Sequence, residues 1–311
     1  MMNRRKFLKG AIVAGAAVTL PGLVGASCGH VARRADGTPE TQPVDAFLAG
    51  GARVMWVAAH PDDECFGGSL LARASIHYRN PLAMVILTRG DGGECCRPEG
   101  CLPDVATVRA AEMQQVSERY RAGLTHFSYW NAPLPVESFP KRHEIYAKWC
   151  QQGDPVGDVV ASIRRFKPDL VLTFDHVHGG TGHPEHQLAS RIATTAVKLA
   201  ADPGVVAGGL MAHRVERTYH LLNRFWLLRM LGQADPGPVT ETFDASLPAV
   251  PGVSCADFMA DATRFHRTQE NDMGLVRKIQ SSAFNDVSMR RIDPFSVTLD
   301  PAERVLKGGM G

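Results

Sequence analysis

The chain has 311 residues, of which 44% are hydrophobic and 21% are charged, and its formal net charge is +2. This apolar content is enough for one large domain or two modest ones, and it excludes a chain that is disordered throughout. The near balance of acidic and basic residues argues against a nucleic-acid partner.

The N-terminal segment has the composition of an export signal. Residues 3–9 contain the pair Arg4-Arg5 beside Lys6, and an apolar run rich in Gly and Ala follows. This pattern is typical of a twin-arginine signal, so we expect residues 1–28 to be a signal peptide that directs the protein to the periplasm or outside the cell. The alternative is an N-terminal membrane anchor, because the run is about as long as a spanning helix needs.

Cys28 closes this segment, and lipidation there would attach the protein to a membrane surface. Residues 29–48 are polar and are expected to form a linker. We place the folded domain at residues 49–295 and a tail at residues 296–311.

Buried apolar runs alternate with helical spacings along the domain. This alternation predicts a Rossmann-like α/β fold, with a mostly parallel sheet and helices on both faces. The expected strands lie near residues 53–59, 82–87, 125–130, 169–174 and 217–222. The expected helices lie near residues 68–77, 105–121, 156–166, 187–201 and 255–271.

Other segments have less regular patterns. We expect irregular structure at residues 136–153 and a loop at residues 232–254, which is rich in Pro and Gly. The apolar run at residues 225–231 is expected in the core or in the wall of a substrate cleft, with a membrane-surface patch as the alternative.

The loop at residues 88–103 is long and rich in Gly and Cys. Long loops of this kind often form the lid or wall of a site. Because export permits disulfides, Cys101 is expected to pair with either Cys95 or Cys96, and the sequence does not fix which. A Cys-rich zinc knuckle is the alternative.

A cluster of charge follows the first strand, where the chain reads His60-Pro61-Asp62-Asp63-Glu64. In an open α/β sheet, ligands bind at the carboxyl ends of the strands. Charges beside a buried strand are costly unless they are compensated, and a divalent cation would compensate them.

A second polar motif, His183-Pro184-Glu185-His186, follows the fourth strand. Two histidines three residues apart at a helix start can point to one spot. Imidazole and carboxylate groups are the usual ligands of a catalytic zinc that keeps a position open for water. The sequence therefore predicts one zinc site built by both motifs, although other divalent metals accept the same ligands.

The two motifs together resemble the LmbE-like, or PIG-L, family of zinc-dependent N-deacetylases. The likeness extends to residues 87–94, to Arg109-Ala110-Ala111-Glu112 and, more weakly, to His266-Arg267-Thr268-Gln269. It spans most of residues 50–275. Members of this family remove acetyl groups from glycans, glycolipids and glycoconjugates that contain N-acetylglucosamine, so the resemblance implies an amino-sugar substrate.

The resemblance also implies roles for the site residues. By match to the family, the metal ligands are His60, Asp63 and His186, and Asp62 is the general base that takes a proton from the attacking water. His183, in its protonated form, is the expected second donor to the oxyanion.

Four further residues are expected to support the site or contact substrate. Glu64 is expected to bond backbone groups of the first motif, and Glu185, where the family more often has aspartate, is expected to orient His183. Arg89 and Asp91 are expected to contact sugar hydroxyls, with ordinary loop polarity as the alternative.

Two other polar pairs have two interpretations. Arg109 and Glu112 could be a solvated helical ion pair, whereas the resemblance implies that they hold their helix beside the site loops. His176 and His178 lie close to the second motif in the chain and are expected to be loop residues and not ligands.

The leading hypothesis is therefore a zinc-dependent hydrolase that removes an N-acetyl group from an exported or cell-envelope amino sugar. The first alternative is an exported glycan-binding protein with a silent site. The second is a metal-dependent amidase that acts on a non-sugar acylamide. The sequence does not give the sugar, the acyl group or the oligomeric state.

Overall fold

The computed structural model describes residues 42–135, 138–222, 237–279 and 285–304. The expected signal peptide, Cys28 and the apolar run at residues 225–231 lie outside these residues. Within the described part of the chain, no helix combines the length and apolarity that crossing a bilayer requires.

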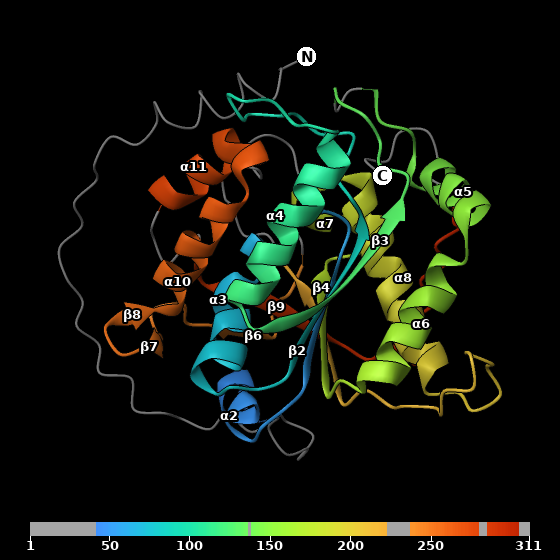
Figure 1. Ribbon diagram of the computed structural model, residues 1–311. Helices are drawn as coiled ribbons and strands as arrows, with labels where there is room; N and C mark the ends of the chain where they lie inside the picture. Colours follow the sequence, from blue (N-terminus) through green and yellow to red (C-terminus); the bar gives the residue numbers. More distant parts are fainter. Residues whose placement is uncertain (1–41, 136–137, 223–236, 280–284, 305–311) are drawn as a thin grey trace. The chain divides into compact units, whose positions relative to one another are not determined.

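A seven-stranded, mostly parallel sheet forms the centre of a single α/β domain (Figure 1). Its strands lie in the order β3-β2-β1-β4-β5-β9-β6. The first five in this order run parallel, and β9 pairs antiparallel with both β5 and β6. The strand bounds are β1 Val54–Ala58, β2 Leu82–Thr88, β3 Ala122–Tyr129, β4 Leu170–Phe174, β5 Arg217–Leu221, β6 Glu241–Phe243 and β9 Val287–Ile292.

Helices cover both faces of this sheet and bury two separate apolar cores. One face packs around Trp56 and Phe174 against α3 (Gly68–Ala72), α4 (Val105–Arg119) and α10 (Cys255–Ala262). The other packs around Val57 and Trp149 against α5 (Arg142–Gln152), α6 (Pro155–Phe166) and α8 (Pro184–Ala200). Every residue of β1 and β4 is buried, and all of them except Thr173 are apolar, as a continuous apolar run predicts for strands covered on both faces.

The order of the strands reverses between β1 and β4. The chain builds β1, β2 and β3 toward one edge and then returns to place β4 on the other side of β1. Such a switch point leaves a crevice at the carboxyl ends of the two strands, where open α/β sheets bind ligands. Both predicted metal motifs leave the sheet here.

The expected mostly parallel α/β fold is confirmed, but several boundaries were wrong. Residues 136–153 contain α5, and the expected loop at residues 232–254 contains β6 and a small hairpin of β7 (Pro248–Val250) and β8 (Val253–Ser254). The strand β9, which lies between β5 and β6, was missed because two arginines interrupt its apolar pattern. Only Val287 and Met289 face the core from it.

The ends of the domain also differ from the expectation. Helix α2 (Val44–Ala49) falls within the expected linker, yet its Val44 and Leu48 are buried in the core. The expected late helix is broken into α10, two 3-10 turns, η4 (Thr263–Phe265) and η5 (Arg267–Gln269), and α11 (Glu270–Lys278). The break turns His266 and Gln269 toward the first motif.

Candidate active site

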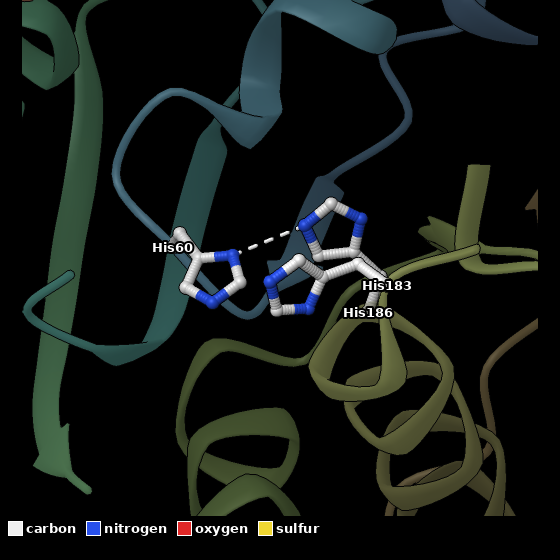
Figure 2. A group of neighbouring side chains, drawn as sticks. All are labelled: His60, His183 and His186. Carbon is white, nitrogen blue, oxygen red and sulfur yellow. Dashed lines mark hydrogen bonds between the residues drawn. The ribbon is translucent and has the colours of Figure 1, made fainter. Parts of the chain in front are cut away.

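The two histidine motifs meet at the switch point. His60 comes from the loop after β1, and His183 and His186 come from the start of α8 (Figure 2). His183 is the N-cap of this helix and Pro184 is its first residue, a position where the missing N–H of proline is harmless. The spacing of three places the two rings on one face, stacked with centroids 4.7 Å apart.

Three potential ligand atoms converge between the motifs. Nδ1 of His60 lies 3.0 Å from Nε2 of His186, which in turn lies 2.9 Å from Oδ1 of Asp63. Nδ1 of His60 is 3.6 Å from Oδ2 of the same carboxylate. The structure therefore brings together the three residues that the resemblance implied as ligands. His183 also belongs to a group with His60 and His186 whose ring nitrogens lie within 4.8 Å of one another.

The outer hydrogen bonds of the two imidazoles fix which nitrogens face this point. Nε2 of His60 donates to the Glu185 carboxylate at 2.6 Å, and Nδ1 of His186 donates to the Gly179 carbonyl at 2.8 Å. Because these partners only accept, the ring protons lie on the outer nitrogens. The lone pairs of the two inner nitrogens and the Asp63 carboxylate then face one another, and this arrangement fits a divalent cation. Metal-binding histidines usually donate their other ring N–H to a carboxylate or a carbonyl, as both histidines do here.

Asp63 is held in its anionic form at this point. Its Oδ2 accepts the backbone N–H groups of Ala59 and His60 at 3.0 and 2.8 Å. Burial alone would raise the pKa of Asp63, but its close contacts with His186 and His60 hold that pKa well below its usual range. A buried anionic oxygen with these neighbours is a suitable metal ligand.

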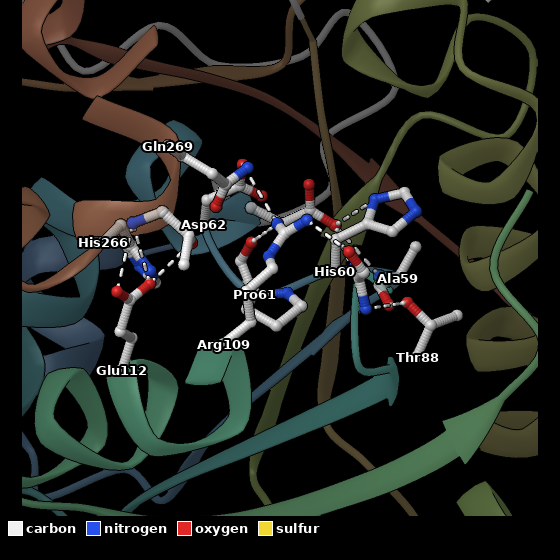
Figure 3. A network of polar contacts seen from close by, with 12 residues as sticks. Ala59, His60, Pro61, Asp62, Thr88, Arg109, Glu112, His266 and Gln269 are labelled. Atoms are coloured by element: carbon white, nitrogen blue, oxygen red, sulfur yellow. Dashed lines mark hydrogen bonds and ion pairs between the residues drawn. The ribbon is translucent and has the colours of Figure 1, made fainter. Parts of the chain in front are cut away.

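Asp62 lies beside the ligands and is held in an unusual backbone conformation, with φ at 105° (Figure 3). Its carboxylate accepts a hydrogen bond from Nε2 of Gln269 and lies 3.7 Å from Nη2 of Arg109. Burial raises the pKa of Asp62 to about 6, although the Arg109 charge opposes this rise. A carboxylate with such a pKa suits proton transfer near neutral pH, and strain of this kind gathers at functional sites.

Arg109 and Glu112 hold the loops around Asp62. Nη2 of Arg109 donates to the Pro61 carbonyl at 2.8 Å and Nη1 donates to the Gly90 carbonyl at 2.6 Å. The Glu112 carboxylate accepts from the N–H of Thr268 at 3.0 Å and from its hydroxyl at 2.6 Å. Both side chains of α4 are buried, so the solvated ion pair was the wrong interpretation and the role implied by the resemblance is the observed one.

Glu64 makes the backbone contact that was expected and a second contact that was not. Its Oε2 accepts the N–H of Asp62 at 3.1 Å, and its Oε1 lies 2.7 Å from Nε2 of His266. Glu64 and His266 are both fully buried, and the carboxylate raises the pKa of the imidazole against the effect of burial. The only sequence signal for His266 and Gln269 was the weak family likeness of their segment.

Glu185 supports a different histidine from the one expected. Its Oε2 accepts from His60 and, at 2.7 Å, from Nδ2 of Asn131, and its Oε1 accepts the N–H of Ala132 at 2.8 Å. Oε2 is 3.9 Å from Nδ1 of His183, beyond hydrogen-bond distance. The carboxylate of Glu185 thus holds His60, whereas its backbone N–H donates at 3.2 Å to Nδ1 of His183, the histidine that Glu185 was expected to orient. Apart from its position after a strand, nothing in the sequence indicated that Asn131 belongs to the site.

The remaining predicted residues lie around this centre. On the loop after β2, Arg89 is half-buried and Asp91 is exposed, and their contact with substrate stays a prediction. His178 contacts Asp175 at 3.2 Å, and Nδ1 of His176 lies 3.3 Å from Nδ1 of His220. Both histidines thus bond partners outside the three-ligand set.

The Cys-rich loop is joined to the segment that carries Gln269. Cys95 and Cys101 form a disulfide, which decides between the two pairings left open, and Cys96 is a free thiol. The N–H of Cys96 donates to the Thr268 carbonyl at 2.9 Å. The loop therefore lies beside the wall of the site that holds Asp62.

Residues 55–197, which include both motifs, match the family described as PIG-L, GlcNAc-PI de-N-acetylase. These residues belong to the PIG-L family. Residues 1–21 match the twin-arginine translocation signal sequence, which indicates export by that route.

Two relatives of this chain come from Streptomyces. A 1D-myo-inositol 2-acetamido-2-deoxy-α-D-glucopyranoside deacetylase from Streptomyces avermitilis is 30% identical over 164 residues, covering 49% of this chain and 54% of the relative. A mycothiol S-conjugate amidase from Streptomyces coelicolor is 28% identical over 156 residues, covering 48% and 53%. The chain thus matches about half the length of these relatives.

Two solved structures share the fold. An N,N′-diacetylchitobiose deacetylase from Pyrococcus horikoshii is 15% identical with a TM-score of 0.55, covering 78% of this chain and 85% of the other. A 4-carboxy-2-hydroxymuconate hydratase from Pseudomonas putida is 14% identical with a TM-score of 0.55, covering 82% and 98%. One of them is named a deacetylase and the other a hydratase, so the PIG-L fold alone does not fix the reaction and the site must decide it.

Proposed function

We propose that the protein is a metal-dependent hydrolase that removes an N-acetyl group from an N-acetylglucosamine-type sugar or glycoconjugate. The observation that carries this proposal is the convergence of His60, His186 and Asp63 on one point beside Asp62. The names of the relatives, a deacetylase of a 2-acetamido sugar and an amidase, support hydrolysis of an amide.

The metal would be held by Nδ1 of His60, Nε2 of His186 and the Asp63 carboxylate. Zinc is the metal that this ligand set most often takes, and another divalent metal is compatible with it. When bound, such a cation supplies a Lewis acid and lowers the pKa of water toward neutrality.

Asp62 is the proposed general base. Its carboxylate takes a proton from the attacking water as the carbon–oxygen bond to the acetyl carbonyl forms. Gln269 and Arg109 hold this carboxylate in place through their contacts with it. After the attack, Asp62 carries the proton that the departing amine needs, so the same residue completes the cleavage of the carbon–nitrogen bond.

His183 is the proposed donor to the oxyanion. Its Nδ1 accepts the N–H of Glu185 at 3.2 Å, which places the ring proton on Nε2. This contact favours a neutral imidazole as the donor, in place of the protonated form that the sequence led us to expect. A donor held in advance by the helix N-terminus stabilises the negative charge that develops on the carbonyl oxygen.

The location of the protein narrows the range of candidate substrates. Export by the twin-arginine route places the folded enzyme outside the cytoplasm, so the proposed substrate is a cell-envelope or external glycan. We retain residues 1–28 as the proposed signal peptide. Attachment to a membrane through Cys28 is the alternative to a freely diffusing product.

The test is acetate release from N-acetylated amino sugars, chitooligosaccharides and peptidoglycan fragments by metal-loaded protein. We expect release that a chelator stops and that added zinc restores. Absence of release from every sugar, with metal bound in the stoichiometry of one ion per chain, would contradict the proposal.

One alternative has a specific observation in its favour. One relative is named an amidase and not a deacetylase, which favours the alternative of a metal-dependent amidase that acts on a non-sugar acylamide. The same panel, extended with acylamides that carry no sugar, separates the two because only the amidase would cleave them. The silent-site alternative is weakened, because Glu185 is fully engaged with His60, Asn131 and Ala132 and so is not a lost function.

A further inference from the structure

Two buried arginines lie next to the candidate site and are not used by the proposed reaction. Arg142 begins α5, Arg191 lies on α8, and their side chains are only 6% and 10% exposed. Both reach the same carboxylate oxygen of Glu303, which lies 3.7 Å from Nη2 of Arg142 and 2.5 Å from Nη1 of Arg191. The Glu303 side chain is itself 56% exposed.

This pair of arginines contacts the helix that carries two of the site histidines. Nη1 of Arg142 donates to Oε1 of Gln187 at 3.1 Å, and Gln187 directly follows His186. Arg191 is five residues after His186 on α8, a rise of about 7.5 Å, and helical side chains point back toward the N-terminus. Both arginines therefore lie along the first half of α8, the helix that begins with the histidine motif.

Their charges also act on the loop before these histidines. Burial lowers the pKa of His176; Asp175 raises it, and three arginine charges lower it further, those of Arg191, Arg290 and Arg142. Nη1 of Arg290 lies 3.8 Å from Oδ2 of Asp175. This region of the site is thus positively charged, and the group of Asp175, His176 and His220, whose ligand atoms also lie close together, is poorly suited to a cation.

The positive charge is incompletely compensated within the described residues. Burial lowers the pKa of Arg142 to about 10, the Arg191 charge adds to this effect, and Glu303 opposes it. Nε of Arg142 and Nε of Arg191 are buried without a hydrogen-bond partner. Two buried cations that share one largely exposed carboxylate are a costly arrangement, because buried charges normally have buried partners.

The tail that carries Glu303 is also fastened through its backbone. The Leu299 carbonyl accepts the hydroxyl of Thr195 at 2.7 Å, and the Asp300 carbonyl accepts Nη1 of Arg191 at 3.2 Å. These backbone contacts already place the tail on α8. The Glu303 carboxylate therefore stands where an external anion could bind.

We propose that Arg142 and Arg191 form a binding site for an anionic group of the substrate, a phosphate or carboxylate carried by the amino sugar or its aglycone. Glu303 occupies this site in the unliganded chain and is displaced by the substrate. Guanidinium groups suit this task because their planar donors match phosphate and carboxylate oxygens. The inference rests on the proposed deacetylase function and narrows its substrate to anionic amino sugars.

The test compares N-acetylglucosamine 6-phosphate, N-acetylmuramic acid and neutral N-acetylglucosamine as substrates of the metal-loaded full chain. We expect Arg191→Gln to raise KM for the favoured anionic sugar about tenfold or more, with a much smaller effect on the neutral sugar. Glu303→Gln should lower KM for the same anionic sugar several-fold, because it removes the competing carboxylate. The preferred probe tells whether the site takes phosphate or carboxylate.

Arg165→Gln, which changes an exposed arginine of α6, is the matched control and should leave the ratio of the KM values unchanged. Equal effects of Arg191→Gln on the charged and neutral sugars would overturn the proposal. So would a Glu303→Gln variant that lowers the melting temperature while leaving the anionic KM as it was, since Glu303 would then be only a structural clamp.

A binding measurement separates this proposal from the proposed function. If no sugar releases acetate, calorimetric titration with inorganic phosphate and with glucuronate still tests the anion site. Binding of one anion that Arg191→Gln abolishes and Glu303→Gln strengthens supports the site, whatever the reaction. Binding that neither variant alters would mean that the anion binds the metal and not the arginines, and it would reject the proposed site. Absence of any binding would also reject it.

Discussion

The Glu185 carboxylate accepts a hydrogen bond from Nε2 of His60 at 2.6 Å, on the side of the ring opposite the nitrogen that faces His186 and Asp63. Glu185 is fully buried and is held in turn by Asn131 and the backbone of Ala132. The carboxylate thus fixes both the tautomer and the orientation of a proposed metal ligand, as outer partners do in metal sites.

Glu185→Gln should therefore weaken metal binding about 10- to 100-fold, because an amide is a weaker acceptor and cannot enforce the same tautomer. Glu185→Asp should have a smaller effect if the backbone adjusts to the shorter side chain. The measurement is competition for zinc with a chromophoric chelator. Glu118→Gln makes the same chemical change at an exposed position of α4 and should leave the affinity unchanged. Unchanged affinity in Glu185→Gln would mean that His60 is not a ligand.

Asp62→Asn should lower kcat about 10²- to 10⁴-fold, the usual contribution of a general base, while the protein still binds metal. Asparagine tolerates the positive φ of 105° at this position, so the backbone should be preserved. The measurements are initial rates on the best substrate of the panel and metal content by atomic absorption. Turnover close to that of the parent protein, with metal bound, would remove Asp62 from the mechanism.

The sequence was sufficient to predict the parts of the site that follow buried strands. The apolar runs before His60 and before the second histidine motif located the carboxyl ends of β1 and β4, and these strands are neighbours in the sheet. Parallel pairing then brings the two motifs together with no further information. The three proposed ligands could be named from this pattern and the family likeness.

The partners that come from elsewhere in the chain could not be predicted in the same way. His266 bonds Glu64 across 202 residues of sequence, and it faces the site only because the late helix is broken at that residue. Asn131 meets Glu185 because the loop after β3 packs against the first turn of α8. Contacts of this kind depend on tertiary geometry, which neither hydrophobic period nor local propensity encodes.

The antiparallel strand β9 was missed for a related reason. In β9, Arg290 and Arg291 come directly after the buried Val287 and Met289. The segment therefore lacks the continuous apolar run of β1 or β4. An antiparallel strand whose one face is partly open to solvent needs few apolar residues. Its pairing with β5 is a long-range antiparallel contact that the local sequence does not specify.

His220 should make the stability of the protein fall as the pH falls below about 6.5. This histidine of β5 is buried, and burial and the neighbouring His176 lower its pKa to about 3. Between these two pKa values the unfolded chain binds a proton that the folded chain does not, so the free energy of unfolding decreases with falling pH. One such group contributes a slope of up to about 1.4 kcal/mol per pH unit.

The measurement is the urea unfolding free energy of the parent protein and of His220→Asn between pH 4 and pH 7, at constant metal concentration. The difference between the two slopes isolates His220 from the other titrating groups. We expect the His220→Asn variant to be less stable at pH 7, where it loses the bond to Thr194 at 2.8 Å, but to have the shallower slope. Parallel curves would show that His220 titrates normally.

Arg109→Ala should destabilise the fold far more than a change at another arginine of the same helix. Arg109 is buried and donates to the carbonyls of Pro61 and Gly90, so its removal leaves two buried acceptors unpaired and frees the Asp62 loop. We expect a loss of about 3 kcal/mol in the free energy of unfolding. The matched control is Arg119→Ala, whose side chain is 42% exposed and pairs with Asp261 and the ring of Phe258. This change should cost about 1 kcal/mol. Equal losses in the two variants would mean that the Arg109 contacts do not hold the loop. A larger loss of stability in Arg109→Ala, together with a lower kcat of the protein that remains folded, would link the support of the Asp62 loop to the reaction.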